Sequence, residues 1–168
     1  GAVTGKLKFN VPTKKFDGSA LTGNVNYTIY VNSTEVSKGT AEAGKEVSTD
    51  LTVEEGVTNF IIILSNEAGE SPRAKLSMYI GNDSPEEVEN LQLTLDKDGK
   101  ATVTWEAPKE GVHNGYIGQL TYDVFRNIGG QSEKVSTGQT DTTFSETITK
   151  GKLSSYSYSV QAINSTKK

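Results

Sequence analysis

Hydrophobic and polar residues alternate with a period of two along several short stretches of the chain. In residues 25–31, VNYTIYV, the larger apolar side chains are Val25, Tyr27, Ile29 and Val31, which share one parity. The alternation recurs at 47–53 (VSTDLTV), at 120–125 (LTYDVF) and, more weakly, in 142–148 through Thr142, Phe144 and Ile148. Successive side chains of a β-strand point to opposite faces, so this pattern predicts strands with one buried face. Helical periodicity is absent, and the sequence predicts an all-β chain.

Turn signals separate these stretches. They are Asp-Gly at 17–18 and 98–99, EEG at 54–56, Gly-Gly at 129–130 and KGK at 150–152. Glycine adopts the positive φ that tight hairpin turns require at little cost. Strands that recur roughly every ten residues with turns between them are typical of a β-sandwich.

The chain contains an internal repeat. GKLKFNVP (5–12) aligns with GKATVTWEAP (99–108), VNYTIY (25–30) with LTYDVF (120–125), and FIIILSN (60–66) with YSYSVQAIN (156–164). The offset between the copies is nearly constant, which predicts two modules of one fold, 1–82 and 83–168. The polar, acidic segment GNDSPEEVENL at 81–91 lies at the boundary, where we expect a short solvated linker.

Composition excludes several classes of function. The net charge is −4, which disfavours a nucleic-acid partner because phosphate binding requires a basic patch. The chain has no Cys, so disulfides and thiolate metal sites are excluded. No apolar run approaches the roughly 18 residues of a membrane span, and we expect no membrane insertion by this segment.

The second copy resembles the fibronectin type III family. Its matching residues are Pro85 before the first strand, Trp105 in TVTWEAP, the stretch YDVFRN, and Tyr156 within YSYSVQAIN. The resemblance implies an immunoglobulin-like sandwich in which Trp105 packs between two sheets and Tyr156 makes the corner hydrogen bond at the start of the sixth strand. The first copy departs from this pattern, with Phe9 in place of the Trp and Thr58 in place of the corner Tyr, so another immunoglobulin-like sandwich stays open there.

The resemblance also implies that each module lacks one edge strand. Family members have seven strands, whereas the first copy starts at the expected strand two and the second ends at strand six. Unpaired edges would then lie beside residues 5–11 and 156–164, and we predict edge-to-edge self-association between copies.

Three clusters suggest chemistry, and each has a simpler explanation. His113 is the only His, and neither a triad nor a zinc site can form from one His without positioned partners. Asp96, Asp98 and Gly99 resemble part of a calcium loop, but a hairpin turn explains DKDG fully. The carboxylates of Glu86, Glu87 and Glu89 lie in the predicted linker, which cannot hold them across a cleft for glycoside hydrolysis. We therefore predict no catalytic, metal or cofactor site.

Exposed aromatic residues are better candidates for ligand contact. Tyr116 lies with His113 and Asn114 in the predicted loop EGVHNGY, and these three residues are our candidate ligand contacts. Tyr30 and Phe125 are expected on the outward faces of their strands, and Trp105 in the core.

Thr142 lies in Asp-Thr-Thr, which matches the O-glycosylation pattern of Bacteroides-type bacteria, and it is our candidate glycosylation site. We expect a non-catalytic, secreted or surface module of a multidomain bacterial protein, which serves in cell adhesion or protein interaction. The alternative is a structural spacer in an extracellular carbohydrate-active enzyme or glycan-binding protein. The ligand, protein or glycan, is not specified by the sequence.

Overall fold

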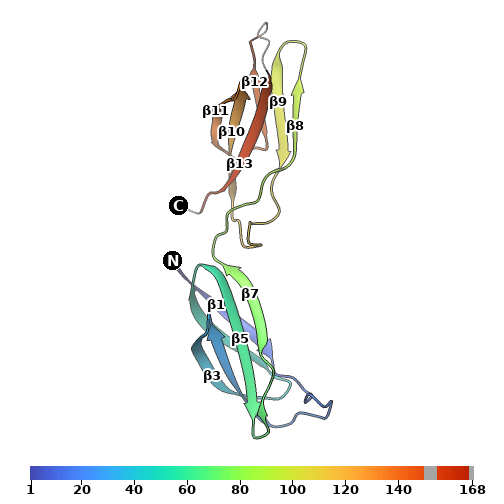
Figure 1. The fold of residues 1–168 in the computed structure, drawn as a ribbon, viewed down its shortest axis with the longest axis vertical. Helices are drawn as coiled ribbons and strands as arrows, with labels where there is room; N and C mark the ends of the chain where they lie inside the picture. The colour runs from blue at the N-terminus through green and yellow to red at the C-terminus, as the bar shows by residue number, and fades with distance from the viewer. Residues whose placement is uncertain (150–154, 167–168) are drawn as a thin grey trace. The chain divides into compact units, whose positions relative to one another are not determined.

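The computed structural model describes residues 1–149 and 155–166, and every described regular element is a β-strand (Figure 1). The chain divides into two compact units, Gly1–Gly81 and Asn82–Lys168. The KGK turn expected at 150–152 lies outside the described residues. No described residue belongs to a helix long and apolar enough to cross a membrane.

The first unit contains two antiparallel sheets. One sheet pairs β1 with β4, and the other has the order β3-β2-β5, with β6 and β7 both paired to β5. The strands are β1 (Ala2–Asn10), β2 (Asn24–Val31), β3 (Thr34–Glu42), β4 (Glu46–Glu54), β5 (Gly56–Asn66), β6 (Gly69–Glu70) and β7 (Ala74–Ile80).

The second unit repeats this arrangement with two differences. Its sheets have the orders β12-β9-β8 and β11-β10-β13. The strands are β8 (Glu89–Leu95), β9 (Lys100–Glu106), β10 (Leu120–Ile128), β11 (Gln131–Gln139), β12 (Thr143–Thr147) and β13 (Tyr156–Asn164). In the described residues β9 has a partner on both edges whereas its counterpart β1 has one, and β5 has partners on both edges whereas its counterpart β13 has one.

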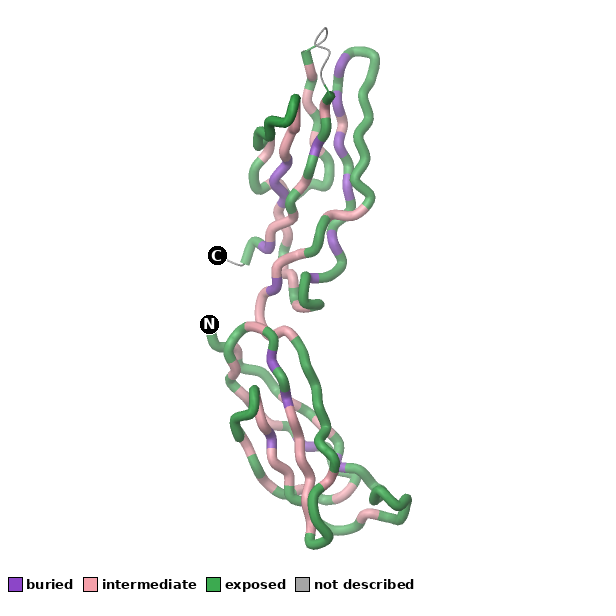
Figure 2. The backbone as a smooth tube through the Cα atoms, viewed as in Figure 1, coloured by how far each residue is buried: buried purple, intermediate pink, exposed green. Residues whose placement is uncertain are grey.

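The alternation in the sequence places the predicted faces inward. Val25 and Ile29 are 3 % and 0 % exposed, and on β4 the odd-numbered residues from Val47 to Val53 are all more buried than their even-numbered neighbours (Figure 2). The Asp-Gly turns are confirmed, since Gly18 and Gly99 have φ of 83° and 85°. The face predicted for 142–148 is wrong at Thr142, which is exposed and precedes β12.

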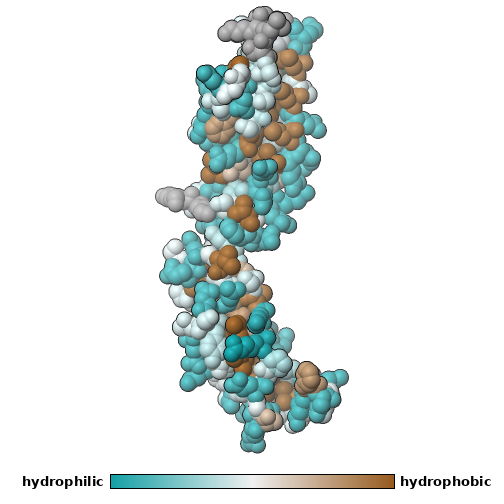
Figure 3. Space-filling view, viewed as in Figure 1, coloured by the Kyte–Doolittle hydropathy of each residue, from teal (hydrophilic) through white to brown (hydrophobic). Residues whose placement is uncertain are grey.

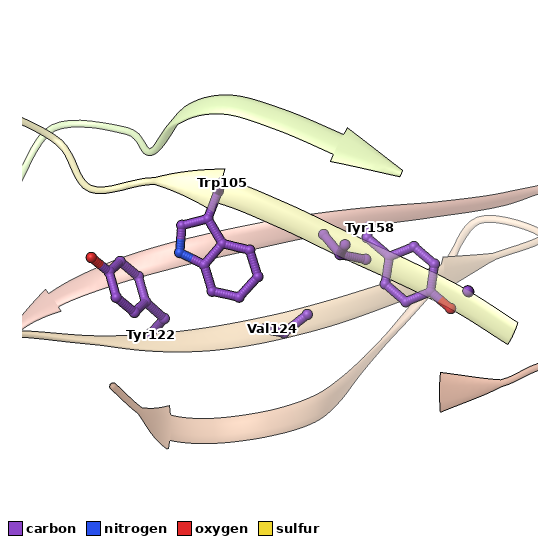
Figure 4. Close-up of a cluster of buried hydrophobic side chains, with 6 residues drawn as sticks. Trp105, Tyr122, Val124 and Tyr158 are labelled. Atoms are coloured by element: carbon purple, nitrogen blue, oxygen red, sulfur yellow. The ribbon is translucent and has the colours of Figure 1, made fainter. Parts of the chain in front are cut away.

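The core of the second unit forms around Trp105, as predicted. Trp105 is 4 % exposed, and its ring meets that of Tyr122 edge-to-face at a centroid distance of 5.4 Å (Figure 4). Ala101, Val103, Val124 and Tyr158 complete the cluster between the two sheets. In the first unit Phe9 packs edge-to-face on Tyr27, with centroids 5.5 Å apart, beside a smaller cluster of Val11, Val25 and Val47.

A polar network also joins the two sheets of the second unit. Glu146 of β12 accepts hydrogen bonds from Arg126 Nη1 of β10, at 2.9 and 2.8 Å to its two oxygens, and from Tyr158 Oη of β13 at 2.6 Å. Burial first, and then the bond to the Glu146 carboxylate, raise the pKa of Tyr158 well above its usual range. Glu146 has the same parity as the inward Phe144 and Ile148, so its place in the core interface follows from strand geometry, and Arg126 neutralises its charge there.

Candidate interaction site

The loop that connects β9 to β10 is held by one buried carboxylate, that of Asp83. Asp83 is 0 % exposed. Its Oδ2 accepts the backbone N–H groups of His113 at 2.7 Å and Gly115 at 3.1 Å, and its Oδ1 accepts that of Ser84 at 2.8 Å. His113 Nδ1 lies 2.9 Å from Oδ1. The side chain therefore satisfies several donors of a loop that lies about 30 residues away in sequence.

The environment of Asp83 keeps the carboxyl ionised. Burial alone would raise the pKa of Asp83, but the hydrogen bonds from the His113 ring and from the amides of His113, Gly115 and Ser84 lower the pKa to about 2. An ionised carboxylate has no proton to give, so Nδ1 of His113 carries the hydrogen in this contact.

Backbone bonds complete the attachment of the loop. Asp83 N–H donates to Tyr116 O at 2.7 Å, Val112 N–H to Ser84 O at 2.9 Å, and Glu86 N–H to Glu110 O at 3.0 Å. Gly111 packs so closely on Asp83 that a Cβ there would collide with the carboxylate. The loop thus has one well-defined backbone path, which we name the Asp83-anchored loop (residues 110–116).

The end of β13 is tied to the same place. Asn164 is 2 % exposed, and its Nδ2 donates to the backbone carbonyl of Asp83 at 3.1 Å. Its Oδ1 accepts the N–H and the hydroxyl of Thr166 at 3.0 and 2.6 Å. Both polar side-chain atoms of this buried Asn therefore have hydrogen-bond partners, and Nδ2 joins the end of the second unit to its start.

The structure brings the three candidate contact residues together in this loop. Tyr116 is 70 % exposed, so its ring is available to a partner. Asn114 is exposed and has a φ of 57°, which fits the tolerance of Asn for the left-handed region. The His113 side chain is half-exposed, with one ring nitrogen engaged by Asp83. Their role as ligand contacts stays a prediction.

The other candidates occupy unremarkable positions. Thr142 is exposed, and its carbonyl accepts the N–H of Trp105 at 3.1 Å, while its glycosylation stays a prediction. Phe125 is partly covered by Lys134, whose Nζ lies 5.5 Å from the ring centroid, and Tyr30 is half-buried. In residues 1–149 and 155–166 no group of three or more acidic or His side chains could hold a metal ion.

The turn predicted for DKDG is confirmed. Asp96 Oδ1 accepts the N–H groups of Asp98 at 2.8 Å and Lys100 at 2.9 Å between β8 and β9. The corner hydrogen bond expected of Tyr156 cannot be traced, because the segment 150–154 before it lies outside the described residues. In the first unit Thr58 is 2 % exposed, and its hydroxyl donates to Gly56 O at 3.1 Å, a short-range counterpart of a tyrosine corner.

Sequence reasoning missed Asp83. The expectation of a solvated linker over 81–91 is wrong there, because Asp83 is buried and Pro85 forms a bridge with Gly111. It holds for Glu86 and Glu87, which are exposed. The sequence holds one weak signal for this anchor. Asp83 precedes Ser-Pro, and the loop in which Asn and Gly follow His113 has backbone N–H groups without a partner in a regular strand, which a carboxylate can accept.

Sequence reasoning also missed a second exposed aromatic residue, Phe16 of the first unit. Phe16 is 99 % exposed in the loop 11–23, which extends away from the strands of its unit (Figure 1). The tip is fixed by Lys15 N–H to Ser19 O at 2.8 Å and by the Asp17 carboxylate, which accepts from Ser19 N–H at 2.9 Å. Beside it lies a cavity of about 390 Å³ with a largely apolar lining that includes Leu21, Leu64, Pro72 and the two lysines 14 and 15.

The surface around these loops is mostly hydrophilic. On the face shown in Figure 3, hydrophobic residues lie among more numerous hydrophilic ones. Exposed apolar residues are normal on a protein surface, so the two loop aromatics are singled out by the degree of their exposure, 99 % for Phe16 and 70 % for Tyr116.

The sequence matches no protein-family model and no curated protein. Among solved structures, this chain is similar to the FN1-FN3 domains of chicken CNTN1, with a TM-score of 0.40 and 11 % identity over 95 % of this chain and 56 % of that chain. It is also similar to a two fibronectin type-III domain segment from chicken tenascin, with a TM-score of 0.39 and 14 % identity over 95 % of this chain and 84 % of that one. This chain thus spans little more than half of the CNTN1 segment.

The fold itself is evident from the strand order. Each unit packs two antiparallel sheets around a core, and in the second unit a Trp lies between them. The chain therefore carries two immunoglobulin-like β-sandwiches in succession.

Proposed function

We propose that the chain is a non-catalytic, extracellular interaction module that contacts a protein or glycan through its loops. The observation that carries this proposal is Tyr116, which is 70 % exposed on a loop whose backbone the buried Asp83 fixes. A Tyr presents a large apolar face and a polar tip, and a rigid loop loses little entropy when it binds.

Phe16 supports the same proposal from the first unit. Its ring is 99 % exposed at the tip of a hydrogen-bonded loop, beside an apolar cavity with lysines at positions 14 and 15. Aromatic side chains, Phe included, are enriched in the cores of protein interfaces.

The surroundings of the Asp83–His113 pair support the non-catalytic proposal. A buried Asp beside a His also occurs in hydrolases, where the His acts on a positioned nucleophile. Here the Asp83 carboxylate also accepts the backbone N–H groups of Ser84, His113 and Gly115. Holding the loop is therefore a sufficient role for the pair.

A second candidate function is that of a structural spacer within a secreted carbohydrate-active or glycan-binding protein. The observation that favours it is that the Asp83-anchored loop is bonded to Asp83, which is itself bonded to Asn164, because a loop used to brace its own unit has a sufficient role without a ligand.

The experiment that separates the two functions compares binding of the wild type and two variants to panels of glycans and matrix proteins. We expect Tyr116→Ala or Phe16→Ala to weaken a detected interaction at least about tenfold, the size of effect typical of a central aromatic contact. Leu95→Ala is the matched control, since Leu95 is 58 % exposed on a strand. If both aromatic variants bind every partner as the wild type does, the interaction proposal is wrong and the spacer is favoured.

A further inference from the structure

The cavity of about 390 Å³ in the first unit lies between the loop 11–23 and the turn that joins β5 to β6. Its volume falls within the range of about 300 to 1,000 Å³ that is typical of ligand pockets. The buried Val25 and the half-buried Leu21 and Leu64 are part of its lining, and Phe16 adds a ring that is 99 % exposed. The cavity can therefore take up an apolar group, with an aromatic side chain beside it.

The loop on one side of the cavity is a small hairpin. Three backbone pairs join its two arms: Leu21 N–H to Thr13 O at 2.9 Å, Lys15 N–H to Ser19 O at 2.8 Å, and an antiparallel bridge between Lys14 and Ala20. At the tip, Gly18 N–H donates to Lys15 O at 2.9 Å, with a φ of 83° at Gly18. The hairpin thus gives Lys14, Lys15 and Phe16 fixed backbone positions.

The other side of the cavity is also held by hydrogen bonds. Ser71 N–H donates to Leu64 O at 2.7 Å, while Ser71 Oγ accepts Leu64 N–H at 3.0 Å and donates to Pro72 O at 2.9 Å. Asn66 Oδ1 accepts the N–H of Ala68 at 2.9 Å. Because both sides are held before any ligand arrives, binding would cost little ordering entropy.

The charges around the cavity favour an anionic partner. Lys14 and Lys15 are exposed in the lining, and neither forms an ion pair with the residues that the structure describes. The neighbouring Asp17 directs its carboxylate to Ser19, whose Oγ lies 2.6 Å from Oδ1. Glu70 is the acidic residue of the described lining. Two lysines against one glutamate give this lining a net charge of +1, in a chain whose net charge is −4.

We propose that the cavity binds an acidic segment of a protein partner, which inserts one large apolar side chain and presents carboxylates to Lys14 and Lys15. The inference rests on the proposed function, because it names the partner that the loop of the first unit would contact. A glycan fits less well, since sugar hydroxyls need free hydrogen-bond partners, whereas Ser71 and Asn66 already bond to the backbone of their own segment. Phe16 would pack against the inserted side chain, as aromatic residues do in interface cores.

The test titrates the whole chain with three N-acetylated, C-terminally amidated peptides and follows the backbone amide signals by NMR. Gly-Asp-Phe-Glu-Gly carries the apolar side chain and the charges, Gly-Asp-Ala-Glu-Gly lacks the apolar side chain, and Gly-Asn-Phe-Gln-Gly lacks the charges. For the first peptide we expect a dissociation constant of roughly 0.1 to 1 mM, because one inserted side chain and two exposed ion pairs supply little affinity. The amide shifts should lie in residues 12–21 and 64–72.

The two other peptides separate the apolar contribution from the charge contribution. The Ala peptide should bind at least about tenfold more weakly, because it has no large apolar side chain to bury. The neutral peptide should bind about threefold more weakly at low salt, and this difference should shrink as salt screens the lysines.

Variants of the chain locate the contacts. Lys14→Gln/Lys15→Gln should abolish the preference for the acidic over the neutral peptide, and Phe16→Ala should weaken both by about threefold or more. Lys8→Gln/Lys38→Gln is the matched control, since these lysines of the first unit are exposed, lie outside the lining and remove the same charge. This control should bind the acidic peptide within about twofold of the wild type.

Three results would overturn the inference: equal binding of the acidic and neutral peptides at low salt, amide shifts confined to other residues, or no binding at about 5 mM acidic peptide. A neutral glycan that shifts residues 12–21 and 64–72 when the acidic peptide does not would also overturn it. If the acidic peptide fails while a partner from the panels still binds in a Tyr116-dependent way, the proposed function stands and the acidic partner alone is wrong.

Discussion

Replacement of the buried carboxylate in Asp83→Asn should destabilise the second unit and leave the first unaffected. The amide keeps the shape of the carboxyl group but has one acceptor oxygen, while Asp83 receives N–H bonds from Ser84, His113 and Gly115 and a contact from the His113 ring. In the variant the amide NH₂ replaces one carboxylate oxygen. The N–H groups that this oxygen accepted would then face another donor and lose their hydrogen bonds.

The magnitude follows from two routes. The fall in the pKa of Asp83 from 3.8 to about 2 corresponds to about 2 kcal/mol of stabilisation of the ionised form by the fold. One or two buried N–H groups left without an acceptor cost about 1 to 3 kcal/mol each. We therefore expect Asp83→Asn to lower the free energy of unfolding of the second unit by about 2 to 4 kcal/mol.

The effect should also depend on pH. Because the folded pKa lies below the unfolded one, the carboxylate contributes its full stabilisation above about pH 5, and this contribution is lost as the pH falls towards about 2. The wild type should therefore lose about 2 kcal/mol of stability relative to Asp83→Asn over this interval. As a result, the difference in free energy of unfolding between the two proteins should shrink in acid.

Urea unfolding followed by Trp fluorescence is a suitable assay. The chain has one Trp, and Trp105 is buried in the second unit, so its emission reports on that unit. Asp98→Asn is the matched control, since the Asp98 side chain is 72 % exposed. If Asp83→Asn and Asp98→Asn have the same midpoint and the same pH profile, the reasoning about Asp83 is refuted.

Three further variants test other parts of the structure. Tyr158→Phe removes the hydrogen bond to Glu146 and should lower the stability of the second unit by about 1 to 2 kcal/mol in the same assay; an unchanged midpoint would mean that water replaces the hydroxyl. Gly111→Ala forces a Cβ against the Asp83 carboxylate and should cost at least about 1 kcal/mol, with no effect in an Asp83→Ala background where the obstacle is gone. Ile29→Ala opens a cavity in the first unit and should lower its stability by about 2 to 5 kcal/mol by circular dichroism, while a shift of the Trp105 transition by a similar amount would contradict separate units.

The fold was predictable because strand faces are encoded locally. Val25 and Ile29 share one parity, and side chains two residues apart share a face whatever else the chain does. Trp105 was placed in the core by the resemblance and by the parity of TVTWEAP. At Glu146 the two sequence signals disagree. Its alternation with Phe144 predicts an inward side chain, whereas its charge predicts an exposed one. The side chain lies inward because Arg126 forms an ion pair with it there.

The anchor of the candidate site could not be predicted, because its contacts are distant in sequence. Asp83 stands in a polar, acidic segment that resembles any exposed linker, and its partners come from a loop 30 residues later. Tyr116 was identified as a candidate from its aromatic type and its Gly-rich surroundings, both local properties. Phe16 has the same two properties, in KKFDG, and the Asp-Gly signal that predicted its turn should also have drawn attention to its ring.

The bond between Asn164 and the Asp83 carbonyl spans 81 residues, nearly the whole second unit. The ribosome synthesises the chain from its amino end, so the bond between Asp83 and Asn164 cannot form until almost all of the unit has been synthesised. Contacts of such long separation slow folding, because the loop must close before the contact contributes. The nascent second unit should therefore expose its β9 and β10 surfaces until Asn164 has emerged, and this interval is when it most needs a chaperone.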